Sequence, residues 1–149
     1  MHKELKKTKL KEMWIVRYAD DFKILCRNHN DAEKIYIAVK NWLKERLGLE
    51  INHEKSGIVN LRRRPSEFLG FEIKVHVKKK RFITRSDITT KAKNKITVGI
   101  RNRIKNLRKH PNRNNVNLLN STILGIQNYY KMATNVNMSL NKIAYRINR

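Results

Sequence analysis

Cysteine is almost absent from this sequence, and it has no long apolar run. Cys26 is the single cysteine in 149 residues, so an internal disulfide is excluded and a reducing compartment is expected. Its place in the apolar run Ile24-Leu25-Cys26 favours a thiol packed in the core. No run approaches the ~20 residues that span a bilayer, and the first five residues lack the apolar stretch of a secretory signal. We expect a soluble, intracellular protein that does not enter a membrane.

Acidic residues are missing from the second part of the chain. All twelve lie between Glu4 and Asp87, whereas Ile88 to Arg149 contains none and carries thirteen Lys and Arg. The formal net charge is +23, and such a surplus attracts polyanions through counterion release. Nucleic acid is therefore the first partner to consider, and an anionic membrane surface the second. A basic structural protein of a ribonucleoprotein would show the same balance.

The first predicted element is a β-hairpin with acids at its tip. Residues 1–12 show no clean period, and we interpret them as a linker or a frayed helix. Two apolar runs follow, Met13–Tyr18 and Phe22–Cys26, separated by Ala19-Asp20-Asp21. β-Branched and aromatic residues on both sides of an Asp-rich break are typical of a hairpin.

A helix is predicted next. Asn30 fits an N-cap, and Glu33 would complete a capping box. The apolar residues at helical spacing are Ile35, Tyr36, Val39, Trp42, Leu43 and Leu47. Gly48 fits a left-handed C-cap, and Leu49-Glu50-Ile51 is a candidate for a short strand.

The chain then changes from a strand pattern to a helix pattern. Phe68–Val77 reads as a half-buried strand, Lys78-Lys79-Lys80 as a turn, and Arg81–Thr84 as the return strand. From about Asp87 the period becomes helical, with an apolar stripe of Ile88, Ala92, Ile96, Ile100, Ile104 and Leu107.

Two further helices are predicted after a break at His110-Pro111-Asn112. The first runs from about Val116 to Ala133, with one apolar face that includes Ile126 and Tyr130, and the second starts near Met138. The sequence therefore predicts an α+β fold that divides at about residue 86. A small antiparallel sheet with a helix precedes this point, and a basic helical bundle follows it.

Asp20 and Asp21 are the strongest candidates for chemistry. Adjacent carboxylates repel each other unless a cation lies beside them, and Mg²⁺ prefers carboxylate oxygens together with substrate phosphates. Two such ions ~3.5–4 Å apart activate a 3′-hydroxyl and stabilise a leaving pyrophosphate in nucleotidyl transfer. Asp-Asp is also ordinary surface turn chemistry, so the pair alone does not decide between these interpretations.

Four motifs, in order, carry a family resemblance. Arg17-Tyr18-Ala19-Asp20-Asp21-Phe22 resembles the palm motif of group II intron reverse transcriptases. Leu49–Ser56 resembles the next palm block, and Phe68-Leu69-Gly70-Phe71 resembles the hairpin that grips the primer end. Gly125-Ile126-Gln127-Asn128-Tyr129-Tyr130 is similar to the Gly-x-x-Asn-Tyr-Tyr signature of the maturase, or thumb, helices.

The resemblance implies a role for each matching residue. Asp20 would bind the catalytic Mg²⁺ ions directly and Asp21 would support it, whereas Phe22 is assigned to the core. Tyr18 and Ala19 would line the nucleotide and primer side of the site. Lys55 would lie near the triphosphate or protonate pyrophosphate, although a loop lysine is commonly only solvated. Gly70 would let the backbone approach the primer strand, and its alternative role is a β-bulge.

The resemblance also implies how the chain is organised and what it binds. Residues 1–12 would be a linker, 13–86 the C-terminal part of a polymerase palm, and 87–149 a truncated thumb. The expected partners are intron RNA, an RNA–DNA template–primer duplex and deoxynucleoside triphosphates, in a bacterial cytoplasm or an organelle matrix. The residues expected to contact nucleic acid are Lys91, Lys95, Arg101, Arg103, Lys105, Arg108, Asn128 and Tyr129.

One part of the family pattern is not matched. The family needs a third metal-binding Asp from a strand upstream of the hairpin, and the acids before Met13 are only Glu4 and Glu12. We therefore expect a fragment, a split product or a degenerate reading frame of a longer RNA-directed DNA polymerase, with a splicing role and no polymerase activity by itself. The alternative is a non-catalytic RNA-binding maturase module in which the acidic pair is a relic.

Overall fold

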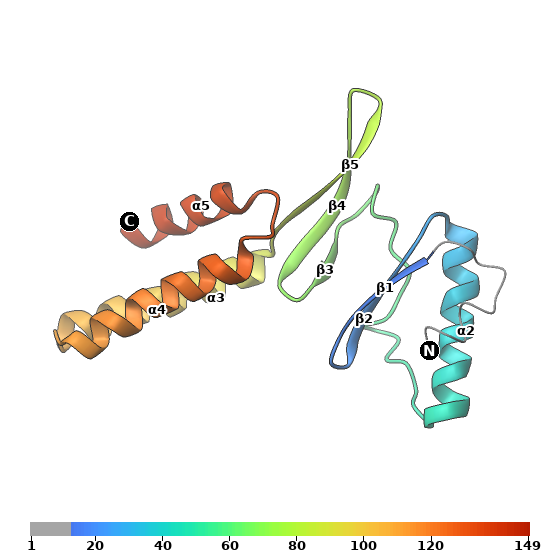
Figure 1. The fold of residues 1–149 in the computed structure, drawn as a ribbon, viewed down its shortest axis with the longest axis horizontal. Helices are drawn as coiled ribbons and strands as arrows, with labels where there is room; N and C mark the ends of the chain where they lie inside the picture. Colours follow the sequence, from blue (N-terminus) through green and yellow to red (C-terminus); the bar gives the residue numbers. More distant parts are fainter. Residues whose placement is uncertain (1–12) are drawn as a thin grey trace. The chain divides into compact units, whose positions relative to one another are not determined.

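The computed structural model describes residues 13–149, and the predicted linker lies outside the described residues. The contacts divide the chain into two compact units, residues 1–60 and 61–149, and each is described by itself (Figure 1). The palm–thumb division at residue 86 is a separate, family-based prediction and stays one. Near it, strand β5 ends at Ile88 and helix α3 begins at Thr90.

The first unit is a hairpin packed on a helix. Strand β1 (Met13–Tyr18) pairs antiparallel with β2 (Asp21–Cys26), and helix α2 (His29–Leu47) follows. Alternate residues of the two strands face the helix because successive side chains of a strand point to opposite sides. Ile35 and Val39 are each 3% exposed and form the centre of this core. The partly buried residues that pack against them are Met13, Ile15, Phe22, Ile24, Cys26, Ala38 and Leu43.

Cys26 and Phe22 lie in this core as expected. Cys26 is a free thiol of intermediate burial. Burial raises the pKa of its thiol, and the nearby charge of Asp31 raises it further, so the group stays protonated near neutral pH. Phe22 contacts the Ile35–Val39 cluster, which agrees with its assignment to packing.

The predicted N-cap of α2 was wrong by two residues. Asn28, not Asn30, caps the helix, and its Oδ1 accepts the backbone N–H of Asp31 at 2.8 Å. Its Nδ2 also donates to Asp31 Oδ2 at 2.8 Å, so Asp31 takes the partner position that the sequence suggested for Glu33. Glu33 instead lies 3.3 Å from Nε2 of His29, one helical turn away.

The end of α2 confirms one prediction and overturns another. Gly48 is the left-handed C-cap (φ 62°), and the N–H of Leu49 donates to Leu43 O at 3.1 Å. The predicted strand at Leu49-Glu50-Ile51 does not form. Its first N–H is used by the helix cap, and Asn52 O then accepts the N–H groups of Lys55 and Ser56 in a local turn.

The second unit begins with a three-stranded antiparallel sheet of order β3-β4-β5. Its strands are β3 (Ser66–Phe68), β4 (Phe71–Lys78) and β5 (Arg81–Ile88). The single strand predicted from Phe68 is instead split by a two-residue turn at Leu69-Gly70, where φ is 51° and 80°. The turn after β4 falls at Lys79-Lys80 as expected, but the return strand continues to Ile88 instead of ending at Thr84.

Three helices follow the sheet. They are α3 (Thr90–Lys109), α4 (Arg113–Tyr130) and α5 (Val136–Asn148). Thr89 caps α3 and Asn112 caps α4 through side-chain oxygens that accept backbone N–H groups. Ile100 of the predicted stripe is buried at 8%, whereas Ile88 belongs to β5 and is 1% exposed. The α+β class is confirmed.

Polar contacts of Asp87 and Ser86 connect the sheet to the helices. Asp87 accepts a hydrogen bond from Ser139 Oγ of α5, and Lys93 Nζ of α3 lies 3.3 Å from Asp87 Oδ2. Ser86 O accepts the N–H of Asn135 at 3.1 Å. Partial burial pushes the pKa of Asp87 upward, but hydrogen bonds from Ser139 and the Ile88 N–H, together with Lys93, outweigh burial and lower it.

Candidate polymerase hairpin and nucleic-acid interface

The acidic pair lies at a two-residue hairpin turn. Ala19 and Asp20 form the turn, while Tyr18 pairs with Asp21 across it, so Asp21 is the first residue of β2. Ala19 has φ 49°, a left-handed conformation that costs an L-residue roughly 1–2 kcal/mol. Arg17 Nε donates to Ala19 O at 2.8 Å and holds the turn closed. Sequence reasoning gave Arg17 no role, although its place directly before the motif was the available signal.

Strand alternation decides which way these side chains face. Phe22 and Ile24 face α2, so Asp21 lies on the opposite side of the hairpin, on the face that its partner Tyr18 shares. Tyr18 is 64% exposed, and Val16 on the same face is 50% exposed. Asp20 and Asp21 are also exposed. The tip therefore presents two carboxylates beside an open apolar face.

The donor chemistry of this tip fits a hard divalent cation. Carboxylate oxygens are the side-chain ligands that Mg²⁺ prefers, and adjacent exposed acids leave oxygens free for it. Within residues 13–149, however, no group of three or more His, Cys, Asp or Glu side chains gathers in a metal-binding arrangement. The tip therefore offers side chains of the type that a hard cation binds, and the described residues add no third acid to it.

The predicted triphosphate ligand, Lys55, belongs to a local turn. Lys55 is exposed in the turn that follows α2, and its backbone N–H donates to Asn52 O at 3.2 Å. No ion pair joins its ammonium group to Asp20 or Asp21. Its contact with the triphosphate stays a prediction.

Gly70 is required by a contact with helix α4. It has φ 80°, and a Cβ at this position would lie 2.8 Å from Tyr130 Oη. The N–H of Thr89 donates to Gly70 O at 2.9 Å, which fixes the turn from its other side. The turn is a tight two-residue connection, so the β-bulge considered for Gly70 is not what forms. Contact with a primer strand stays a prediction.

The Tyr-Tyr pair of α4 holds this same turn. Tyr129 Oη donates to Leu69 O at 3.0 Å, and its ring stacks on Phe71 with centroids 5.7 Å apart. Tyr130 is 8% exposed, as expected of a core residue, and its ring centroid lies 5.1 Å from that of Phe71. Burial raises the pKa of the Tyr130 hydroxyl, and Tyr129 adds to the effect. Tyr129 therefore has a structural role that the sequence did not reveal.

The residues expected to contact nucleic acid are on the surface. Asn128 is exposed, Tyr129 is 53% exposed, and the six cations predicted on α3 are all exposed. Arg101 differs from the others because its guanidinium donates to the carbonyl oxygen of Arg146 in α5. This hydrogen bond joins helices α3 and α5.

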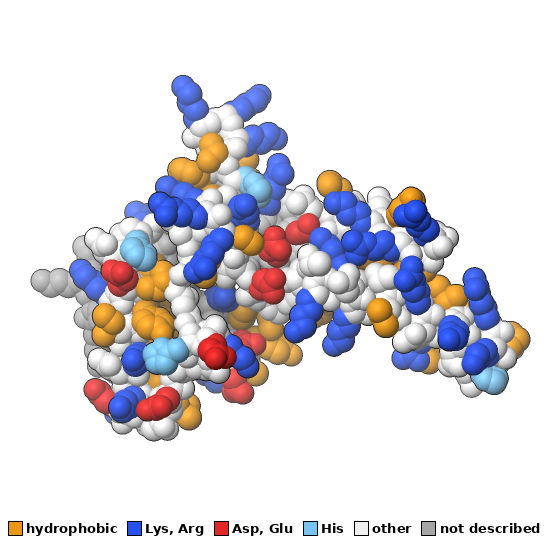
Figure 2. Space-filling model, turned by 180° about the vertical axis from the view of Figure 1, so that it is seen from behind, with side chains coloured by type: hydrophobic (Ala, Val, Ile, Leu, Met, Phe, Trp, Pro, Cys, Tyr) orange, Lys and Arg blue, Asp and Glu red, His pale blue; other side chains and the backbone are white. Residues whose placement is uncertain are grey.

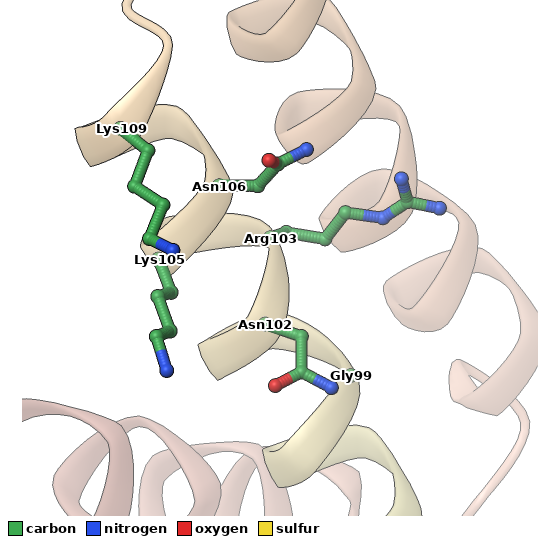
Figure 3. A pocket seen from close by; sticks show the side chains of 6 residues that line it. All are labelled: Gly99, Asn102, Arg103, Lys105, Asn106 and Lys109. Carbon is green, nitrogen blue, oxygen red and sulfur yellow. The ribbon is translucent and has the colours of Figure 1, made fainter.

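A shallow hollow lies along α3. It is lined by Gly99, Asn102, Arg103, Lys105, Asn106 and Lys109. Figure 3 shows Lys105 and Lys109 extended on one side of the helix, whereas Arg103 and Asn106 point to the other. Small and amide side chains alternate with cations, which is a suitable lining for a phosphate chain and too open to enclose a small ligand.

Comparison with known proteins identifies the family of the first half of the chain. Residues 1–73 match the family described as reverse transcriptase (RNA-dependent DNA polymerase). The chain therefore carries a reverse transcriptase domain over these residues. It is also 32% identical, over 163 aligned positions, to a Saccharomyces cerevisiae protein named for intron 2 of COX1/OXI3. That alignment covers 91% of this chain and 19% of the yeast protein, so the chain spans about a fifth of the length of this relative.

The family match covers the predicted site. The matched residues contain Tyr18, the Asp20–Asp21 tip, Lys55 and Gly70. The yeast relative extends the likeness over nearly the whole sequence. In the part of the chain that the structure describes, no helix is both long and apolar enough to cross a membrane.

Proposed function

We propose that the chain is the C-terminal palm and thumb of a group II intron-encoded RNA-directed DNA polymerase with a splicing role. The observation that carries this is the Tyr18-Ala19-Asp20-Asp21 hairpin, which lies within the residues that match the reverse transcriptase family. An exposed turn puts two carboxylates where a template–primer can reach them. The compartment we infer is the one that holds the intron RNA, a bacterial cytoplasm or an organelle matrix.

The proposed mechanism assigns one task to each residue of the tip. Asp20 and Asp21 would hold Mg²⁺, which when bound activates the 3′-hydroxyl and stabilises the leaving pyrophosphate. Arg17 keeps Asp20 at the tip by bonding to Ala19 O. Tyr18 and the small Ala19 would border the sugar and base of the primer end, and Lys55 would meet the triphosphate. We further propose that a third carboxylate comes from outside residues 13–149.

An extension assay tests this proposal. The chain is mixed with Mg²⁺, an RNA template with a DNA primer, and deoxynucleoside triphosphates. We expect no extension by this chain alone, and extension only when an upstream palm segment with the third Asp is supplied. That extension should disappear in Asp20→Asn. Extension by the chain alone would contradict the need for an outside carboxylate, and extension that survives Asp20→Asn would contradict the site.

A second candidate function is RNA binding without catalysis. The observation that favours it is the charge of residues 88–149, which contain thirteen Lys and Arg and no acid. This function predicts an affinity for intron RNA that falls steeply between low and physiological salt and is unchanged in Asp20→Asn. The same binding measurement on Lys91→Gln/Lys95→Gln should show a loss, because both lysines are exposed on α3.

A further inference from the structure

The outer part of the β4–β5 hairpin is a ribbon with a cationic face. Residues directly opposite each other in an antiparallel pair place their side chains on the same face. The register pairs Lys74 with Arg85 and Lys78 with Arg81. β3 pairs with β4 only as far as Ile73, and the N–H of Val75 donates to Leu61 O at 2.9 Å. Beyond Val75 the strands continue as a two-stranded ribbon, which Figure 1 shows extending away from the helices of this unit.

The turn of this ribbon is strained and fully basic. Lys79 and Lys80 form it, with φ 47° and 64°. Two successive positive φ values define the hairpin turn in which Asn-Gly is favoured and side chains such as lysine are not. Like charges directly opposite each other also destabilise a sheet. The ribbon therefore combines backbone strain with repulsion in Lys74–Arg85 and Lys78–Arg81.

No acidic side chain relieves that repulsion. From Ile73 to Ser86 the sequence contains six Lys and Arg and no Asp or Glu. The nearest acids on these strands, Glu72 and Asp87, face each other at the base, and Asp87 is occupied by Lys93. Within residues 13–149, none of the six cations has an ion pair. On the face seen in Figure 2, Lys and Arg side chains spread from the projecting end, and acidic ones appear nearer its base.

The opposite face of the ribbon is apolar and carries one further cation. Val77 and Phe82 are paired across the strands and are 69% and 57% exposed. The guanidinium carbon of Arg62 lies 3.9 Å from the centre of the Phe82 ring, which is a cation–π contact. The ribbon thus has a cationic face and an apolar face, and Arg62 contacts Phe82 on the apolar one.

We propose that this basic ribbon, defined as Lys74, Lys78, Lys79, Lys80, Arg81 and Arg85, is an arm that grips the phosphate backbone of duplex nucleic acid. This rests on the proposed nucleic-acid binding and adds a site separate from α3. Its two cation pairs are four residues apart along the strand, roughly 13 Å, so they meet several phosphates along one backbone. Lysines act as flexible point charges, so the grip is independent of base sequence and sensitive to salt.

The sharpest variant makes the turn more stable while removing its charge. Lys79→Asn/Lys80→Gly in the full chain supplies the residues that this turn prefers. We expect its melting temperature to rise by about 5 °C, while its affinity for an RNA duplex falls. The slope of log affinity against log salt should flatten by about 1.4–1.8, because two phosphate contacts are lost and each contributes about 0.7–0.9. The ratio of wild-type to variant affinity should fall about tenfold when the salt concentration is raised from 50 to 200 mM.

A second variant and a control complete the test. Lys78→Glu turns the Lys78–Arg81 repulsion into an attraction, so it should also raise stability and lower affinity. Lys34→Gln/Lys40→Gln removes two exposed charges from α2 and should leave the salt slope within 0.5 of wild type, far less than one full phosphate contact. Repeating the titrations with DNA duplex, RNA–DNA hybrid and single strands identifies which backbone the arm prefers.

The outcomes separate this arm from the proposed function. Ribbon variants that bind RNA within twofold of wild type, while Lys91→Gln/Lys95→Gln binds more weakly, overturn the arm and leave the proposed function standing. A wild-type chain that binds no duplex even at 50 mM salt overturns both. Ribbon variants that lose binding only to anionic phosphatidylserine vesicles also overturn the arm, because the face would then serve a membrane surface.

Discussion

The tips of two hairpins in this chain are both exposed two-residue turns, and they carry opposite charges. Ala19-Asp20 connects β1 to β2, and Lys79-Lys80 connects β4 to β5. Each turn has two residues, each is exposed, and each places a residue other than glycine at positive φ. The first tip presents two carboxylates, and the second presents four consecutive cations from Lys78 to Arg81.

A third hairpin turn shows what these two lack. Leu69-Gly70 connects β3 to β4 and is packed against α4, where Tyr130 leaves no space for a Cβ at position 70. A glycine at position 70 satisfies two demands: it adopts the positive φ without strain, and it leaves room for Tyr130. The two exposed tips have no such packing, so no neighbouring element accounts for the positive φ of Ala19, Lys79 and Lys80. What distinguishes the tips is the charge that each presents, for which we have proposed a metal ion at the acids and phosphates at the lysines.

The largest expected effect breaks the packed turn. Gly70→Ala adds a Cβ 2.8 Å from Tyr130 Oη at φ 80°, and Tyr130 is too buried to move freely. Strain and overpacking together should cost about 3 kcal/mol in urea unfolding of the chain. Gly125→Ala is the matched control, since its Cβ meets nothing within 4 Å, and it should be neutral or stabilising by up to ~1 kcal/mol. Equal effects at both positions would contradict the contact.

A smaller effect distinguishes two roles for Tyr129, stabilising the Leu69-Gly70 turn and binding RNA. Tyr129→Phe removes the hydrogen bond to Leu69 O but keeps the stacking on Phe71. We expect a loss of about 1 kcal/mol in unfolding free energy. If holding the turn is its whole role, RNA affinity measured by filter binding stays within twofold of wild type. A tenfold loss of affinity with unchanged stability would instead support the direct RNA contact predicted from the sequence.

The two exposed tips should respond alike to relief of strain. Ala19→Gly and Lys80→Gly each place glycine at a positive φ, and each should stabilise the chain by roughly 0.5–1 kcal/mol, because the left-handed penalty exceeds the entropic cost of glycine. Urea midpoints of the two variants are the measurement. If either variant is less stable than wild type, the replaced side chain stabilises that turn. The two tips would then differ in how they are held.

The smallest expected effect is on the pH dependence of folding stability, and it comes from Asp87 at the base of the basic ribbon. The pKa of Asp87 is lower in the folded chain than in the unfolded one, because hydrogen bonds and Lys93 outweigh partial burial. Its contribution is therefore present above its ordinary pKa, about 3.9, and is lost as pH falls below that value. Asp87→Asn should flatten this part of the stability–pH curve between pH 5 and 2. An equally steep acid loss in the variant would assign the effect to other groups.

The sequence was most informative where a local pattern decides the structure. Alternation and helical period predicted the β1–β2 hairpin, the Lys79-Lys80 turn and the apolar stripe of α3, since each depends on nearby residues. The strand at Leu49–Ile51 failed because the cap of α2 takes its first N–H, and the unbroken strand from Phe68 failed because Gly70 meets Tyr130 across the fold. Contacts 60 residues apart, such as that of Tyr129 with Leu69, leave no local pattern.

The candidate site shows the same limit. The motif that contains Asp20 and Asp21 was visible in the sequence because its residues are adjacent. The bracing of that turn by Arg17 was not, and neither was the opposition of Lys74 to Arg85, which depends on strand register.

Cation binding at the Asp20–Asp21 tip tests the central claim most directly. Mn²⁺, a paramagnetic substitute for Mg²⁺, is titrated into the isotope-labelled chain while amide signals are followed by NMR. The account predicts selective broadening of residues 18–22, reversed by excess Mg²⁺ and absent in Asp20→Asn. Broadening that is spread over all acidic residues, or that persists unchanged in Asp20→Asn, would contradict a metal-binding role for this hairpin.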